Sequence, residues 1–316
     1  MGRKSSYVPD LETSGRMGQW LEPYPPPPPP PPPQGWVPWL MPLVALVLVF
    51  AFAFAMFVND CPSSKDHEAT DCVFYSSLGR FSFEPFFVNP LLGPTAETLD
   101  KLGALDYKKI VMDGERWRLV SCMWLHAGIV HLLANLFSLI FTGIRLEEEF
   151  GFVKIGLLYF LSGLGGSLMS CFSNKLSISV GASGALFGLL GAMLSELITN
   201  WTIYSNKCTA LFTLLLVIGI NMAVGAVPHV DSSAHIGGFV SGFLLGFVLL
   251  MRPQHGYISR KHIPPGYNME LIRPKFKIYQ LLLCLMSLAL LIIGFGYGLI
   301  KLKLLHMDQQ QIWLLN

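Results

Sequence analysis

Long apolar runs separated by polar segments dominate the chain. Seven of these runs approach the roughly 20 residues that an α-helix needs to cross a membrane. The fourth and sixth runs are slightly short, which suits helices whose ends meet water inside the protein. The runs cover residues 38–58, 119–144, 153–172, 182–198, 208–227, 234–251 and 279–300. The hydropathy pattern therefore predicts an all-α membrane protein, built as a polytopic helical bundle.

The composition supports this class. Of the 316 residues, 52% are hydrophobic and only 13% are charged, whereas soluble domains carry about 25% charged residues. The formal net charge of +2 gives no sign of a nucleic-acid surface, so no nucleic-acid partner is expected. Six cysteines are too few and too scattered for a disulfide scaffold or a zinc cluster. Only Cys61 and Cys72 share a polar loop, and we expect a disulfide between them if that loop faces an oxidising compartment.

The polar segments divide the chain into successive parts. They are a proline-rich and disordered tail (1–37), six spans (38–251) with a long first loop (59–118), a basic loop (252–278), the seventh span (279–300) and a final tail (301–316). Because the spans must lie in a bilayer, lipid covers much of the predicted surface.

The amino-terminal tail contains a proline run from Pro25 to Pro33, which is predicted to adopt polyproline II. We interpret this run as a stiff spacer, and the alternative is a ligand for a proline-reading domain. Met1 and Gly2 followed by Ser6 match the short pattern for N-myristoylation. No apolar segment begins near Met1, so we expect no signal peptide.

The charges of the short loops predict the orientation of the chain in the membrane. The polar segment after the sixth span is basic, whereas the loop before that span, residues 228–233, has no lysine or arginine. By the positive-inside rule the basic segment lies in the cytosol, and seven spans then place the N-terminus in the cytosol and the C-terminus outside or in a lumen. The basic residues are Arg252, Arg260, Lys261, Arg273, Lys275 and Lys277.

Few polar side chains lie inside the spans, and the pattern places them at one end of the bundle. Such side chains are expensive in a bilayer and usually functional. His131 and Asn135 lie in the lumenal half of the second span, Ser183 opens the fourth and His235 opens the sixth. These three spans all begin on the lumenal side, so the four residues are predicted to lie at similar depth. A transporter that relays protons through histidines would instead spread polar groups across the membrane.

Ser183 is the best candidate for a nucleophile. It stands in the stretch Gly181-Ala182-Ser183-Gly184, where small residues allow a backbone or a substrate to approach closely. Its position in a first helical turn places unpaired backbone N–H groups beside it, which can stabilise negative charge. His235 can take the proton of Ser183, so the pair predicts a serine hydrolase.

The other polar residues are assigned around this pair. His131 and Asn135 share one helix face and are predicted to donate hydrogen bonds to an oxyanion. His126 lies about 140° round the helix from His131 and is predicted to point elsewhere. Asp231 falls in a loop and is interpreted as a solvated turn residue, which leaves a dyad rather than a triad. The chain has no HExxH motif and His131 lacks a clear third ligand, so neither a metal nor another cofactor is expected.

Glycines give two of the spans smooth faces that can pack closely. Three glycines recur every four residues in the sixth span, and two stand four apart in the fourth. If these faces meet, Ser183 comes within reach of His235, and we interpret the glycines as packing residues without a chemical role. They are Gly184 and Gly188 in the fourth span and Gly238, Gly242 and Gly246 in the sixth.

Together these motifs resemble those of the rhomboid intramembrane serine proteases, over roughly residues 85–251. They are Gly181-Ala182-Ser183-Gly184, the spacing of His126, His131 and Asn135, Ala234-His235-Ile236-Gly237-Gly238, Trp117-Arg118, and Glu147 with Gly151. The resemblance implies a six-helix core followed by one C-terminal transmembrane helix, as in plant rhomboid-like proteins. It also implies that Ser183 and His235 are the catalytic dyad. His131 and Asn135 match the family's oxyanion donors, and His126 matches a structural position.

One position departs from the family pattern. Many bacterial members carry tyrosine four residues after the serine, where this chain has Phe187. A phenylalanine can still stack on His235, but it cannot make the hydrogen bond of a tyrosine hydroxyl.

The resemblance implies an intramembrane serine endopeptidase that cleaves single-span membrane proteins near their lumenal or extracellular end. A spanning helix hides its peptide bonds in its own hydrogen bonds, so such a substrate must first unwind locally. The alternative is a catalytically inactive rhomboid-like protein that binds membrane clients for trafficking or quality control. The complete set of polar residues favours the enzyme. An extra helix after the core is typical of family members in the secretory pathway, which favours the Golgi or the plasma membrane.

Overall fold

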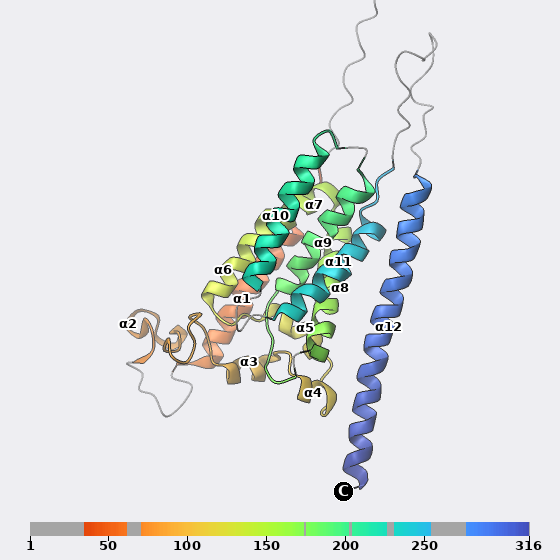
Figure 1. The fold of residues 1–316 in the computed structure, drawn as a ribbon. Helices are drawn as coiled ribbons and strands as arrows, with labels where there is room; N and C mark the ends of the chain where they lie inside the picture. Colours follow the sequence, from red (N-terminus) through yellow and green to blue (C-terminus); the bar gives the residue numbers. More distant parts are fainter. Residues whose placement is uncertain are drawn as a thin grey trace, which may run out of the picture. The chain divides into compact units, whose positions relative to one another are not determined.

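The computed structural model describes residues 35–61, 71–173, 175–201, 204–225, 231–253 and 276–315. The proline run, Gly2 and the basic residues Arg260, Lys261, Arg273 and Lys275 lie outside the described residues. In the described part, five helices are long and apolar enough to cross a membrane, and α9 and α10 are shorter apolar helices. The protein is thus an all-α polytopic membrane bundle with a six-helix core and one additional C-terminal helix (Figure 1).

The apolar helices follow one another along the chain and are joined by irregular segments. Short helices lie mainly in the first loop, between α1 and α6. The apolar helices are α1 (Leu40–Asn59), α6 (Ile129–Ser138) continued by the π-helical turn η6 (Leu139–Gly143) and α7 (Ile144–Phe150), α8 (Phe152–Ser173), α9 (Ser183–Thr199), α10 (Lys207–Gly225), α11 (Ser232–Leu249) and α12 (Ile278–Leu315).

Helix α11 packs most extensively against α9 and α8. The α9–α11 contact is backbone against backbone: a Cβ atom on Gly238 would lie 1.9 Å from the carbonyl oxygen of Gly184. A Cβ atom on Gly242 would lie 2.1 Å from the carbonyl oxygen of Gly188. The two glycine faces therefore meet, as their spacing predicts, and only glycine fits at these contacts.

The second span does not begin at residue 119, as the hydropathy predicts, but at Ile129. Residues 118–124 form the short helices α5 (Arg118–Ser121) and η5 (Cys122–Trp124), and the chain then becomes extended. The first loop lies against this extended segment, where the N–H groups of Ile129 and Val130 donate to carbonyls of Leu92 and Leu91. Backbone groups bonded to another segment cannot begin a helix earlier, so the span covers Ile129–Phe150.

Glu147 holds the start of α1 against α7. Its carboxylate accepts the backbone N–H groups of Trp39, Leu40 and Met41 at 2.8–3.0 Å, and its side chain is fully buried. The first N–H groups of a helix have no partner within it, and a negative charge is favoured at that end. Glu147 thus provides the hydrogen-bond acceptors that water would provide to the first N–H groups of a solvent-exposed helix.

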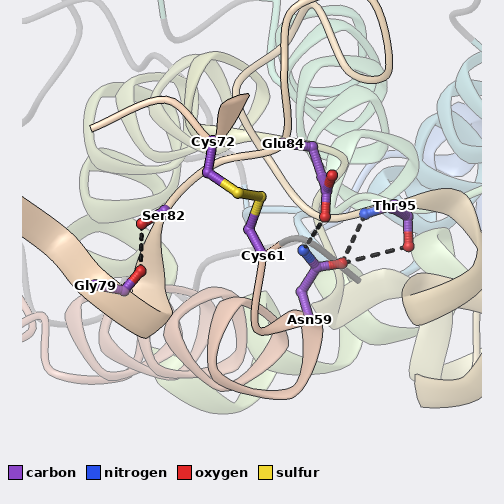
Figure 2. The surroundings of a disulfide bond; sticks show 7 residues. All are labelled: Asn59, Cys61, Cys72, Gly79, Ser82, Glu84 and Thr95. Atoms are coloured by element: carbon purple, nitrogen blue, oxygen red, sulfur yellow. Dashed lines mark hydrogen bonds between the residues drawn. A yellow bond between two sulfur atoms is a disulfide. The ribbon is translucent and has the colours of Figure 1, made fainter. Parts of the chain in front are cut away.

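The first loop is held together by polar contacts and one disulfide. The predicted bond between Cys61 and Cys72 is present, beside a buried network centred on Asn59 (Figure 2). Asn59 Nδ2 donates to Glu84, and Asn59 Oδ1 accepts the backbone N–H of Thr95. The loop also contains α2 (Tyr75–Leu78), η4 (Gly79–Phe81), α3 (Ala96–Leu102) and α4 (Tyr107–Val111).

Arg118 joins α5 to the helices of the first loop. Its buried guanidinium donates to the carbonyls of Asp100 and Ala104 and pairs with the carboxylates of Asp100 and Glu115. Trp117 covers the turn at Gly103, where an added Cβ atom would lie 2.3 Å from the indole ring. The Trp117-Arg118 pair therefore supports the loop and lies apart from the polar residues of the core.

Helix α12 packs against α11 and contacts both ends of the core. Near its start, Tyr279 and Gln280 donate to the carbonyl of Thr199 at the end of α9. Near its other end, His306 donates to the carbonyl of Val111 at 2.7 Å. The helix does not stop at residue 300, as the hydropathy predicts, but continues to Leu315. Leu302 is buried in this extension, and the helix contacts α4 of the first loop.

Replacing Gly238 by alanine should destabilise the fold by about 1–3 kcal/mol, because the new methyl group collides with backbone that cannot move aside. Thermal unfolding in detergent measures this change. Gly219→Ala in α10 is the matched control, since its Cβ atom would meet nothing within 4 Å and alanine is the better helix former. Equal midpoints for the two variants would contradict the argument from close packing.

Candidate active site

Ser183 and His235 meet where α9 and α11 begin. Ser183 is the first residue of α9 and His235 lies in the first turn of α11. The Nε2 atom of His235 is 2.8 Å from the hydroxyl oxygen of Ser183. Ser183 is half-buried and His235 is buried. The pair has the hydrogen bond that a nucleophile and its general base require.

The ring of His235 is held by packing. Phe187, one turn beyond Ser183, stacks on it with ring centroids 4.3 Å apart and an interplanar angle of 23°. Within the described part of the chain, the buried Nδ1 atom of His235 has no hydrogen-bond partner. The stacking expected of Phe187 is therefore present, and among described residues no acid bonds to His235 to make a triad.

Asp231 is not the solvated turn residue that its loop position suggests. It is the N-cap of α11, where its Oδ1 atom accepts the backbone N–H of Ala234 at 3.1 Å. Its Oδ2 atom accepts a hydrogen bond from the hydroxyl of Ser170, a fully buried residue of α8. The interpretation as a solvated turn residue is wrong because α8 lies close enough to bind the carboxylate.

His131 lies against the backbone just before Ser183. Gly181 has φ +131°, and a Cβ atom there would lie 2.7 Å from His131 Cε1. Gly181 is therefore required both by its backbone conformation and by the approach of the imidazole. Its N–H donates to the carbonyl of Cys122 at 2.9 Å, which holds the segment before α9 in place.

Asn135 lies one turn beyond His131 on α6. Its Nδ2 atom donates to the His131 carbonyl at 2.8 Å and the residue is buried. Its Oδ1 atom has no partner among the described residues. The Nδ2 atom carries two hydrogens and uses one of them for the His131 carbonyl, so the second can donate to a group that enters from outside.

His126 does not point away from His131. Its ring is fully buried and packs against the His131 ring with centroids 5.2 Å apart. The prediction from helical angles was wrong because α6 begins at Ile129, so His126 lies in the extended segment before the helix. The contact places His126 behind His131, where it supports the imidazole.

One cavity of about 930 Å³ is lined by Ser183, His235, Phe187, His131 and Asn135, but not by His126. It extends between α6, α9, α10, the start of α11 and the first loop, with walls that include Val130, Leu190 and Leu99. Asn221 of α10 also lines it, a residue that the sequence analysis missed although an asparagine inside an apolar run is itself a signal. The predicted site residues that line this cavity are His131, Asn135, Gly181, Ser183 and His235.

The remaining predicted residues lie outside the cavity. Gly184, Gly238 and Gly242 form the helix contact, Trp117 and Arg118 support the first loop, and Glu147 caps α1. Among the described residues no group of three histidine, cysteine, aspartate or glutamate side chains is placed to hold a metal ion. The cavity therefore presents the hydroxyl of Ser183 bonded to the imidazole of His235, and its wall also contains the imidazole of His131 and the amide of Asn135.

Comparison with known proteins is consistent with this geometry. The model of the Rhomboid domain matches residues 113–252. RHOMBOID-like protein 5 of Arabidopsis thaliana is 54% identical over 311 residues, which cover 98% of this chain and 97% of that protein. Inactive RHOMBOID-like protein 8 of the same plant is 42% identical, over 74% of this chain and 64% of its own length.

A protein named as a protease is also similar. Rhomboid-like protease 5 of Toxoplasma gondii is 37% identical over 52% of this chain and 20% of its own length. The long match to the first relative extends through the core and the seventh helix, and the domain match includes Ser183, His235, His131 and Asn135. The chain belongs to the rhomboid family.

Proposed function

We propose that the protein is an intramembrane serine endopeptidase that cleaves single-span membrane proteins near their lumenal or extracellular face. The observation that carries the proposal is the 2.8 Å contact between Ser183 Oγ and His235 Nε2 inside a cavity bounded by apolar helices. Because a substrate helix conceals its peptide bonds, we expect substrates with helix-weakening residues near the cut.

In the proposed reaction Ser183 attacks the carbonyl carbon of the scissile bond. The Ser183 proton passes to His235 as the new carbon–oxygen bond forms, and the carbonyl electron pair moves onto the oxygen. That oxyanion is stabilised by His131 and Asn135 together with backbone N–H groups at the start of α9. The electron pair then returns to re-form the carbonyl, the carbon–nitrogen bond breaks, and the imidazolium gives its proton to the leaving amine. Water, deprotonated by His235, attacks the resulting acyl-enzyme, and its ester bond to Ser183 breaks as Ser183 takes back the proton.

The alternative function is that of an inactive family member that binds membrane clients for trafficking or quality control. The existence of a similar protein with the name Inactive RHOMBOID-like protein 8 keeps this alternative open. Against it stands the complete constellation of serine, two histidines and asparagine around one cavity. A client-binding protein has no need of a hydroxyl bonded to an imidazole.

Ser183→Ala should abolish cleavage while leaving the fold intact, because it removes the nucleophile and little volume. The measurement is co-expression with a library of single-span proteins, comparing wild type with the variant by the appearance of cleaved fragments. Residual cleavage within about tenfold of wild type would contradict the dyad, since loss of a nucleophile costs far more than that.

Asn135→Ala should lower turnover by about 10²–10³-fold, as expected for the loss of one oxyanion donor. The substrate affinity should change little, because the interaction is made in the transition state. His126→Ala is the comparison, and its loss of activity should follow a loss of thermal stability. Full stability of the His126 variant with no turnover would contradict this division of roles.

We also propose that the protein lies in the secretory pathway, at the Golgi or the plasma membrane, with a cytosolic N-terminus. The disulfide between Cys61 and Cys72 supports an oxidising compartment on the side of the first loop, and the basic residues after α11 support a cytosolic opposite side. The bilayer and single-span substrates are the proposed partners. The run from Pro25 to Pro33 is proposed as a spacer.

In sealed microsomes, protease added from outside should remove a tag at the N-terminus and leave a tag at the C-terminus protected. Mass spectrometry of the unreduced protein should find Cys61 joined to Cys72. A protected N-terminal tag, or two free thiols, would contradict the proposed topology. A fluorescent fusion that colocalises with mitochondria would contradict the proposed compartment.

A further inference from the structure

Asp231 lies one helical turn before His235, and the mechanism above gives it no role. Its two carboxylate oxygens have separate partners on two helices. Oδ1 accepts the N–H of Ala234 at 3.1 Å, and Oδ2 accepts the hydroxyl of Ser170. The side chain also lines the cavity that contains Ser183 and His235.

These contacts fix the start of α11. The backbone N–H of His235 donates to the Asp231 carbonyl at 3.3 Å, so the capped turn carries the histidine itself. Ser170 lies on α8, which packs against both α9 and α11, and its side chain is fully buried. The carboxylate thus ties the turn that carries His235 to the helix that lies behind both members of the dyad.

The carboxylate also supplies charge where the reaction needs it. When His235 accepts the Ser183 proton, its ring becomes a buried cation. The ring lies at the N-terminus of α11, and the positive end of the helix dipole destabilises a cation there. Asp231 is the N-cap of the turn that contains His235, and both residues line the same cavity, so the carboxylate favours a positive charge on the ring. Since the Nδ1 atom of His235 has no hydrogen-bond partner in the described part of the chain, this interaction acts through space.

We propose that Asp231 is a positioning residue for His235, with a carboxylate that fixes the first turn of α11 and stabilises the imidazolium without bonding to it. This inference rests on the proposed protease function. It divides the role of Asp231 into a cap, which an uncharged asparagine can also provide, and a charge, which asparagine lacks.

The experiment compares Asp231→Asn, Asp231→Ala and Ser170→Ala with wild type and with Ser183→Ala. Each is measured for kcat and KM on a cleaved single-span substrate, for the rate at which a fluorophosphonate labels Ser183, and for thermal unfolding. Asp106→Asn is the matched control, because Asp106 caps α4 through the N–H groups of Lys108 and Lys109, away from the cavity.

Asp231→Asn should lower kcat and the labelling rate by about tenfold, equivalent to about 1.36 kcal/mol in the barrier, with KM and the unfolding midpoint unchanged. Asp231→Ala should lower kcat by the same factor. It should also lower the thermal unfolding midpoint by a few degrees, since it removes the cap. Ser170→Ala should lower kcat in the same direction, and Asp106→Asn should match wild type.

The inference would be overturned if Asp231→Asn had the kcat of wild type. It would also be overturned if the variants lost activity only in proportion to a fall in their unfolding midpoints. Either result would leave the proposed function standing, because wild type would still cleave and Ser183→Ala would not. Absence of both cleavage and Ser183 labelling in wild type would overturn the proposed function and this inference together.

Discussion

The backbones of α9 and α11 touch, and the arrangement of the candidate active site depends on that contact. An α-helix normally keeps its neighbour 8–10 Å away with side chains. Here Gly238 and Gly242 lie against the carbonyls of Gly184 and Gly188, so no side chain separates the helices. Lipid gives helices no hydrophobic reason to associate, and the association must come from close packing of this kind.

The same contact sets the distance between the reacting groups. Ser183 precedes Gly184 by one residue and His235 precedes Gly238 by three, so the dyad lies at the end of the glycine contact. A third helix enters at this level, since a Cβ atom on Gly166 of α8 would lie 2.6 Å from the carbonyl of Ala234. With three backbones packed together, the starts of α9 and α11 are held against the C-terminal half of α8, and the short side chain of serine suffices to reach the imidazole.

Much of this could be predicted from the sequence, and the reasons are physical. Apolar runs of spanning length identify membrane helices because lipid leaves few alternatives, and glycines four apart identify a helix face. Contacts between distant segments could not be predicted. The start of the second span depends on hydrogen bonds from the first loop, the cap at Asp231 depends on Ser170 of α8, and the ring of His126 depends on where α6 begins. In each case hydropathy predicts the segment to which a residue belongs, but it does not predict which distant segment packs against that residue.

The segment that leads into α9 shows how such long-range contacts position the nucleophile. Leu105 and Ser179 exchange two backbone hydrogen bonds at 2.9 and 3.0 Å, which joins the first loop to the residues just before Ser183. That loop is itself held by the disulfide, by Arg118 and by His306 of α12. An extended segment has no hydrogen bonds of its own, so its conformation is set by the segments it pairs with. The first loop, which lines the cavity at Leu91 and Leu99, helps to fix the backbone from which Ser183 begins its helix. The seventh helix supports that loop through His306.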